Sequence, residues 1–215
     1  MKAKKILVGI VAIAVLLAVV GYYVVMPMII KSHLPKPVLI NTDNQPTLGN
    51  PAAKIHIVTF EDLKCANCAR FNKTIFPTIK SDYIDKGIAN YTMINLAFVQ
   101  GSMPAANAAR CVYAQNHDAF FAFIDAIFQN QPPETENWAT LPTLLSIAEK
   151  VPHINTDKLA SCMIQSPYTT FINNNLTLAR QILTPEVVTP SVFVNGVRVT
   201  PLTEWQLKRV IMAVQ

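Results

Sequence analysis

The chain has 215 residues, enough for one domain of ordinary size and an accessory segment. Its formal net charge is +5, and removing the five lysines that precede residue 50 from its 18 basic residues leaves 13, against 13 acidic ones. The body of the protein is therefore neutral, which excludes a generally basic surface and predicts no nucleic-acid partner. The five lysines are Lys2, Lys4, Lys5, Lys31 and Lys36.

An uncharged apolar run covers residues 6–30 and follows the first three lysines. About 20 apolar residues are needed to span a bilayer, whereas a signal peptide has a shorter apolar core that ends at a small-residue cleavage site. Because Ala12-Ile13-Ala14 lies inside the run, we favour an uncleaved transmembrane anchor over a cleaved signal. The N-terminal lysines place residues 1–5 in the cytoplasm, so we predict a single-pass membrane protein whose remaining chain is periplasmic or extracytoplasmic.

Residues 31–50 are rich in proline and asparagine and predict a linker that holds the next domain off the membrane. Within this linker, residues 37–40 suggest a short edge strand. An exported domain lies in an oxidising compartment where disulfides persist. Its four cysteines therefore point to two redox pairs rather than to four free thiols.

The most informative stretch is a strand that leads into a pair of cysteines. Alternating apolar residues from Ile55 to Phe60 predict a half-buried strand, and a helical period begins after Cys68. Cys65 and Cys68 therefore lie where a helix begins, and free backbone N–H groups and the helix dipole favour a thiolate there. We expect Cys65 to be the attacking sulfur and Cys68 to be the resolving thiol.

Two other uses of a Cys-x-x-Cys pair have to be weighed against redox chemistry. A structural zinc site needs four ligands, usually from a second closely spaced Cys or His pair, and the sequence contains no such pair. Two inert buried thiols are the remaining alternative. We predict redox chemistry, with no metal and no other cofactor.

After this helix the chain continues with one strand and a long helical block. Pro77 should divide the helix near Phe76, Gly87 should cap its end, and residues 88–98 predict a central strand. Residues 102–183 contain no convincing strand and are broken at prolines, which predicts an inserted helical unit. The expected helices cover residues 105–115, 120–128, 138–150, 157–165 and 168–182.

The C-terminal segment predicts a β-hairpin and a last helix. A β-branched run over residues 187–194 leads into Asn195-Gly196, the strongest short hairpin signal, and a return strand follows over 197–200. Pro190 inside this run marks either a strand entry or a cis Thr189–Pro190 bond that presents the Thr189 backbone. The final helix should pack on the sheet.

The order of these parts resembles a thioredoxin fold with an inserted helical domain, as in the membrane-tethered extracytoplasmic members of the DsbA family. The resemblance runs from about residue 49 to the C-terminus. It implies an α/β protein whose thioredoxin-like domain comprises residues 51–101 and 184–215, with a helical insertion over 102–183. The motifs that carry it are Gly49-Asn50-Pro51-Ala52, Phe60-x-Asp62-x-x-Cys65-x-x-Cys68 and Thr189-Pro190-x-x-Phe193-Val194-Asn195-Gly196.

The resemblance implies a thiol:disulfide oxidoreductase, a dithiol oxidase that donates a Cys65–Cys68 disulfide to reduced exported proteins. By position, Cys65 would be an exposed nucleophile, Cys68 its buried partner and Pro190 a cis-proline facing the disulfide. Thr189 would touch the substrate. A quinone-linked membrane oxidase of the DsbB type would reoxidise the pair, and we expect the protein to be a monomer.

Two departures from the family pattern bear on redox tuning. The strongest oxidants of the family carry Pro-His between the cysteines, where this chain has Ala66-Asn67, and asparagine donates a hydrogen bond but carries no charge. Thr59 stands where many relatives have a buried acid. Glu61 shares its strand face and would partly replace that acid, unless Glu61 and Asp62 are solvated charges at the strand end. We predict a weaker oxidant than those members.

Relatives with a second cysteine pair in the helical block imply a structural disulfide between Cys111 and Cys162. It would close a loop of about 50 residues and stabilise the fold by a few kcal/mol. A redox relay and two buried thiols remain as alternatives for this pair. For the whole protein, the alternatives are a disulfide reductase or isomerase, and a membrane-tethered chaperone or peptide-binding module whose cysteines are only structural.

Overall fold

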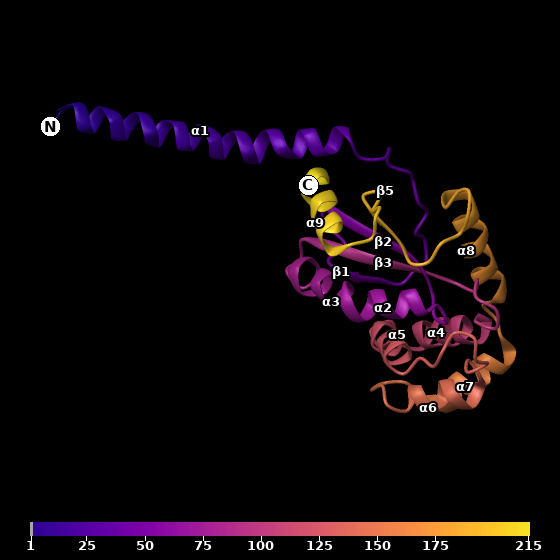
Figure 1. Cartoon of the computed structure of the whole chain (residues 1–215). Helices are drawn as coiled ribbons and strands as arrows, with labels where there is room; N and C mark the ends of the chain where they lie inside the picture. Colours follow the sequence, from indigo (N-terminus) through magenta and orange to yellow (C-terminus); the bar gives the residue numbers. More distant parts are fainter. Residues whose placement is uncertain (1) are drawn as a thin grey trace.

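The computed structural model describes residues 2–215, and for residues 2–8, 26–27 and 31 it describes the backbone alone. Met1, part of the predicted cytoplasmic segment 1–5, lies outside the described residues. Helix α1 (Lys2–Ser32) projects from the body of the molecule (Figure 1). Its segment Gly9–Ile30 has 22 residues and a mean hydropathy of 2.5, so it is long and apolar enough to cross a membrane.

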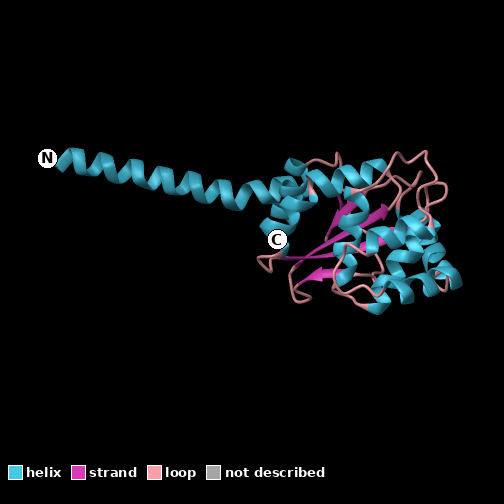
Figure 2. Ribbon diagram, turned by 90° about the horizontal axis from the view of Figure 1, so that it is seen from below, coloured by secondary structure: helices cyan, strands magenta, loops and turns pink. Residues whose placement is uncertain are grey.

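A five-stranded mixed sheet with the order β1-β3-β2-β4-β5 forms the centre of the body (Figure 2). Strands β2 and β3 run parallel, and the other neighbouring pairs are antiparallel. The prediction of a short edge strand over residues 37–40 is wrong, because this segment does not pair as a strand and makes one backbone hydrogen bond, from Val38 to Gly196. The strands are β1 (Thr47–Gly49), β2 (Ile55–Asp62), β3 (Ala89–Leu96), β4 (Ser191–Val194) and β5 (Val197–Arg198).

Helices cover both faces of the sheet. Helices α2 (Ala66–Thr74), α3 (Phe76–Ile79) and α9 (Glu204–Val214) pack on the face that carries Ile57 and Tyr91. Helix α8 (Thr169–Ile182) packs on the opposite face, against Phe60 and Ile94. The half-buried strand expected over residues 55–60 is therefore wrong: every residue of β2 except His56 is buried, as is usual for a central parallel strand.

Proline and glycine set the limits of the helical segment after the cysteines, as predicted. Helix α2 ends at Thr74, Pro77 lies in the first turn of α3, and a π-helical turn η1 (Lys80–Ile84) follows. Gly87 ends the segment with φ at 69°, and its N–H donates to the Ile84 carbonyl at 2.9 Å. Glycine reaches this left-handed conformation without steric strain.

The helical insertion contains the expected number of helices, close to the expected positions. The helix predicted over 138–150 is shorter and begins at Leu141, because Thr140 has extended backbone and Pro142 fits the first helical turn. Besides α8, the helices are α4 (Met103–Gln115), α5 (Ala119–Gln129), α6 (Leu141–Ala148) and α7 (Thr156–Gln165).

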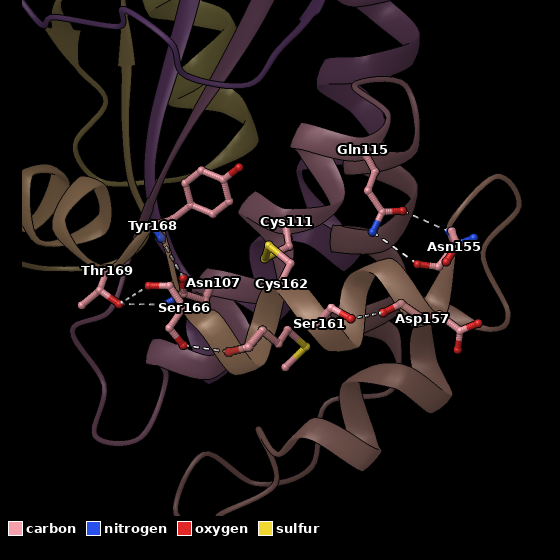
Figure 3. Close-up of a disulfide and its surroundings, with 11 residues drawn as sticks. Asn107, Cys111, Gln115, Asn155, Asp157, Ser161, Cys162, Ser166, Tyr168 and Thr169 are labelled. Carbon is pink, nitrogen blue, oxygen red and sulfur yellow. Dashed lines mark hydrogen bonds between the residues drawn. A yellow bond between two sulfur atoms is a disulfide. The ribbon is translucent and has the colours of Figure 1, made fainter.

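A disulfide joins Cys111 of α4 to Cys162 of α7 (Figure 3). The sulfur atoms are 2.05 Å apart and the Cα atoms 6.0 Å apart. This is the pairing that the resemblance implied. It connects two helices of the insertion whose cysteines are separated by 51 positions in the sequence.

The segment expected to be a linker, residues 31–50, contacts the body at several points. The Val38 N–H donates to the Gly196 carbonyl at 2.9 Å, and the buried amides of Gln45 and Asn175 are joined by a 2.6 Å hydrogen bond. Residues 47–49 form β1, and the C-terminal end of α1 packs against α9. The segment is therefore attached to the body in both of its halves.

Candidate active site

The two cysteines lie where β2 passes into α2, as predicted. Cys65 directly precedes α2, and Cys68 lies in its first turn. The Cys65 N–H donates to the Asp62 carbonyl at 3.1 Å, which closes the turn between strand and helix. Both residues are free thiols.

The exposure of the two sulfurs differs less than the resemblance implied. Cys68 is fully buried, and Cys65 is only 6% exposed, so the expectation of an exposed Cys65 is wrong. The cause is the loop before β4: the Cys65 thiol donates to the Thr189 carbonyl at 3.5 Å. Cys65 still retains the surface access that Cys68 lacks.

The surroundings of the two sulfurs move their pKa values in opposite directions. Hydrogen bonds from the Cys68 thiol, the Thr189 side chain and the backbone N–H groups of Cys68 and Asn67 lower the pKa of Cys65 to about 6, against the effect of its burial. Burial, followed by the hydrogen bond to Cys65, raises the pKa of Cys68 well above its usual value. At neutral pH Cys65 is therefore the thiolate and Cys68 the thiol.

Thr189 lies against Cys65 just before β4, and Pro190 follows it. The Thr189–Pro190 bond is cis, which decides between the two readings of this proline that the sequence allowed. Pairing of Ser191 with Phe60 of β2 fixes the position of this loop relative to the cysteines. The loop therefore closes one side of the dithiol.

A surface groove of about 290 Å³ runs beside the cysteines, between α2 and this loop. Phe71, Val188 and Leu202 give it apolar walls, and Arg70 is the charged residue among those that line it. The side-chain oxygen of Asn67, which also lines the groove, accepts a hydrogen bond from the Arg70 guanidinium. Asn67 therefore acts on Cys65 through its backbone N–H, while its side chain is held by Arg70.

Glu61 is a fully buried acid on the face of β2 that α2 covers, so the alternative of a solvated charge is wrong. Its Oε1 accepts hydrogen bonds from the Thr59 hydroxyl at 2.8 Å and from the Tyr91 hydroxyl at 2.6 Å. Its Oε2 has no partner among the described residues. Burial raises the pKa of Glu61 to about 7, although the hydrogen bonds from Tyr91 and Thr59 lower it.

Asp62 is also fully buried and joins two loops beside the cysteines. Its carboxylate accepts hydrogen bonds from the Lys64 N–H at 2.7 Å, the Phe98 N–H at 2.7 Å, the Val99 N–H at 2.8 Å and the Ser102 hydroxyl at 2.8 Å. Burial outweighs these bonds and raises the pKa of Asp62. Asp62 thus fixes the loop after β3 against the turn that carries Cys65.

Ala66, expected to take part in redox tuning, contributes its backbone. Its N–H donates to a carboxylate oxygen of Glu134 at 2.8 Å. Sequence reasoning missed Glu134 because it lies 68 positions away, in the insertion, and no local motif marks it. Among the described residues, no three His, Cys, Asp or Glu side chains are grouped so that they could hold a metal ion.

A dithiol with one ionised and one protonated sulfur is the working unit of thiol:disulfide oxidoreductases. Residues 41–213 match the protein family described as Thioredoxin, and the chain therefore belongs to the thioredoxin family.

Several relatives carry names that refer to disulfide bonds. A probable disulfide bond formation protein D of Bacillus cereus is 34% identical over 154 residues, which cover 71% of this chain and 70% of the relative. Disulfide bond formation protein D of Bacillus subtilis is 31% identical over 152 residues, which cover 70% and 68%.

Crystal structures of DsbA-like proteins share the fold. DsbA of Chlamydia trachomatis aligns with a TM-score of 0.75 at 31% identity, over 82% of this chain and 95% of that one. Oxidised BdbD of Bacillus subtilis aligns with a TM-score of 0.76 at 27% identity, over 84% and 96%. These likenesses confirm the predicted thioredoxin-like α/β fold and the predicted class: the chain is a DsbA-like thiol:disulfide oxidoreductase. The likeness to proteins named for disulfide bond formation supports the predicted direction, oxidation of dithiols.

Proposed function

We propose that the chain donates a Cys65–Cys68 disulfide to pairs of reduced cysteines in substrate proteins, with Cys65 making the covalent contact. The observation that carries the proposal is the pKa of Cys65, lowered to about 6, beside a partner sulfur whose pKa is raised. A sulfur that is a thiolate at neutral pH is a good leaving group. Because the Cys65 thiolate is stable, the reduced enzyme is favoured over the disulfide form, and the Cys65–Cys68 disulfide is therefore an oxidant.

The transfer takes two exchange steps. A substrate thiolate attacks the Cys65 sulfur, a mixed disulfide forms, and Cys68 leaves as a thiolate that takes up a proton. A second substrate thiolate then attacks the substrate sulfur of the mixed disulfide, and Cys65 leaves as a thiolate. Two electrons pass from the substrate to the cysteine pair, and the substrate gains one disulfide.

Glu61 is assigned as the proton source for Cys68. Cys68 must be protonated when it is released, because its pKa is well above the usual value, and the charge of Glu61 is one of the causes. A carboxyl group with a pKa of about 7 holds a proton at neutral pH part of the time and gives it up readily. Glu61 thus tunes the redox reaction through Cys68, the buried sulfur, whose pKa it raises.

Thr189 and Pro190 are assigned to substrate binding. Thr189 contacts Cys65 and both residues line the groove beside it, so a substrate joined to this sulfur passes beside them. The apolar groove along α2 offers space for the residues that flank the substrate cysteine. Cys111 and Cys162 are assigned to stabilising the insertion.

The cellular setting completes the proposal. Helix α1 anchors the protein in the cytoplasmic membrane, with residues 1–5 inside and the catalytic domain on the periplasmic or extracytoplasmic side. The length and apolar character of Gly9–Ile30 and the lysines before it support this orientation. Reduced exported proteins are then the substrates, a quinone-linked oxidase of the DsbB type restores the disulfide, and the enzyme acts as a monomer.

The proposal is tested with the oxidised full-length protein in detergent and a reduced peptide that has two cysteines. We expect mass spectrometry to show one disulfide transferred per enzyme, and none with Cys65→Ser. Reduced Cys68→Ala, mixed with the oxidised peptide, should accumulate a mixed disulfide at Cys65. The double variant Cys111→Ala, Cys162→Ala is the matched control and should retain transfer.

Two results would change the assignment. Peptide oxidation that survives in Cys65→Ser would remove Cys65 from the reaction. A wild-type enzyme that reduces an oxidised peptide but does not oxidise a reduced one would make the protein a reductase.

A further inference from the structure

One loop of the insertion reaches the residues on either side of Cys65. Residues 130–140 connect α5 to α6 and lie against the turn between β2 and α2. The Gln131 side chain donates to the Leu63 carbonyl at 3.2 Å, and the Ala66 N–H donates to the Glu134 carboxylate at 2.8 Å. The carboxylate of Glu134 is therefore bound to the backbone of Ala66, the residue that follows Cys65.

The hydrogen bond to Glu134 uses a group that would otherwise favour the Cys65 thiolate. The first N–H groups of a helix have no partner within the helix and carry its positive partial charge. The N–H groups of Asn67 and Cys68 point to Cys65, whereas that of Ala66 points to Glu134. The carboxylate thus offsets part of the positive end of α2 at the residue that follows Cys65.

Other charged groups around the dithiol are placed differently. Glu61 and Asp62 are buried beneath it, and Lys64 is buried with its ammonium group donating to the Gln100 carbonyl at 2.9 Å. Arg70 lies on the groove side and donates to the Asn67 side chain. Unlike these four groups, Glu134 accepts a hydrogen bond from the backbone of the first residue of α2.

We propose that Glu134 is a positioning residue through which the helical insertion weakens the oxidant: its carboxylate engages the Ala66 N–H and opposes the negative charge of the reduced Cys65. The inference rests on the proposed role of Cys65 as the reactive thiolate. The interaction of one charge with a helix N-terminus corresponds to a factor of about two to five in an equilibrium constant, and we take the part of this interaction that Glu134 offsets to be of the same size. Removing the charge of Glu134 should therefore favour the thiolate, and with it the reduced enzyme, by that factor.

The test compares full-length wild type with Glu134→Gln, which keeps the side-chain shape but loses the charge. We expect thiolate absorbance at about 240 nm to show the acid dissociation constant of Cys65 raised about two- to five-fold. Equilibration with glutathione should show the Cys65–Cys68 disulfide more oxidising by the same factor, because both quantities measure the stability of one thiolate. Glu136→Gln changes an exposed residue of the same loop, is the matched control and should change neither quantity.

The outcomes separate this inference from the role of Cys65. Unchanged values in Glu134→Gln, or equal changes in Glu134→Gln and Glu136→Gln, would overturn the inference, the second because it would show a general charge effect. A change in the acid constant without the matching change in the glutathione equilibrium would overturn it as well. The role of Cys65 is checked separately, because the thiolate absorbance should disappear in Cys65→Ser whatever Glu134 does.

Discussion

Replacing Glu61 with glutamine tests the buried acid beneath the cysteines. The pKa of Glu61 is raised from 4.5 to about 7, mainly by burial. Since the folded-state pKa lies above the unfolded value, the stability contribution is fully present below about pH 4.5 and is lost as the pH rises through about 7. The difference between these two pKa values corresponds to about 3 kcal/mol of unfolding free energy.

Urea unfolding of the reduced full-length protein, followed by tryptophan fluorescence between about pH 4 and about pH 9, measures this effect. Cys65 also titrates in this range and its charge is coupled to Glu61, so both proteins carry Cys65→Ser, and the difference between the Glu61→Gln protein and its parent reports Glu61. We expect the stability of the variant relative to this parent to rise by about 3 kcal/mol from the acid to the alkaline end. A difference that does not depend on pH would refute the reasoning.

Three other substitutions test separate contacts. Cys68→Ala removes the hydrogen bond that is the largest cause of the lowered pKa of Cys65, so the thiolate absorbance of Cys65 should titrate with a midpoint above about pH 6. A midpoint that remains at about pH 6 would contradict this cause. The double variant Cys111→Ala, Cys162→Ala opens a loop with a sequence separation of 51 and should lower the unfolding free energy by about 4 kcal/mol in urea, with no change in the redox equilibrium. Asp62→Ala leaves three backbone N–H groups without their acceptor and should lower the unfolding free energy by about 3 kcal/mol, more than Asp62→Asn does. A loss below about 1 kcal/mol would show that water replaces the carboxylate.

The features predicted correctly from the sequence depend on local backbone chemistry. Pro77 divides the helix because it lacks an N–H, and Gly87 ends it because it adopts positive φ. Asn195-Gly196 forms the hairpin turn, with φ values of 48° and 81°. Such restrictions act within a few residues, so the sequence alone displays them.

The features that were missed depend on contacts between distant segments. The burial of Cys65 results from Thr189, the loop held by Asp62 lies 36 positions or more away, and Glu134 approaches Ala66 from the insertion. Glu61 was left undecided because its burial is set by the helix that covers its strand, not by its neighbours in sequence. The cysteine pair could therefore be predicted, but its surroundings required the tertiary structure.

The reduction potential of the Cys65–Cys68 couple, measured by equilibration of the full-length protein with glutathione, tests the central claim most directly. A Cys65 pKa of about 6 lies between the value of about 7 in thioredoxin and the value of about 3.5 in DsbA. The couple should therefore have a potential between about −270 mV and about −120 mV, the values of those two proteins, and Cys65→Ser should show no such transition. A potential at either limit, or a transition that persists in Cys65→Ser, would contradict the account.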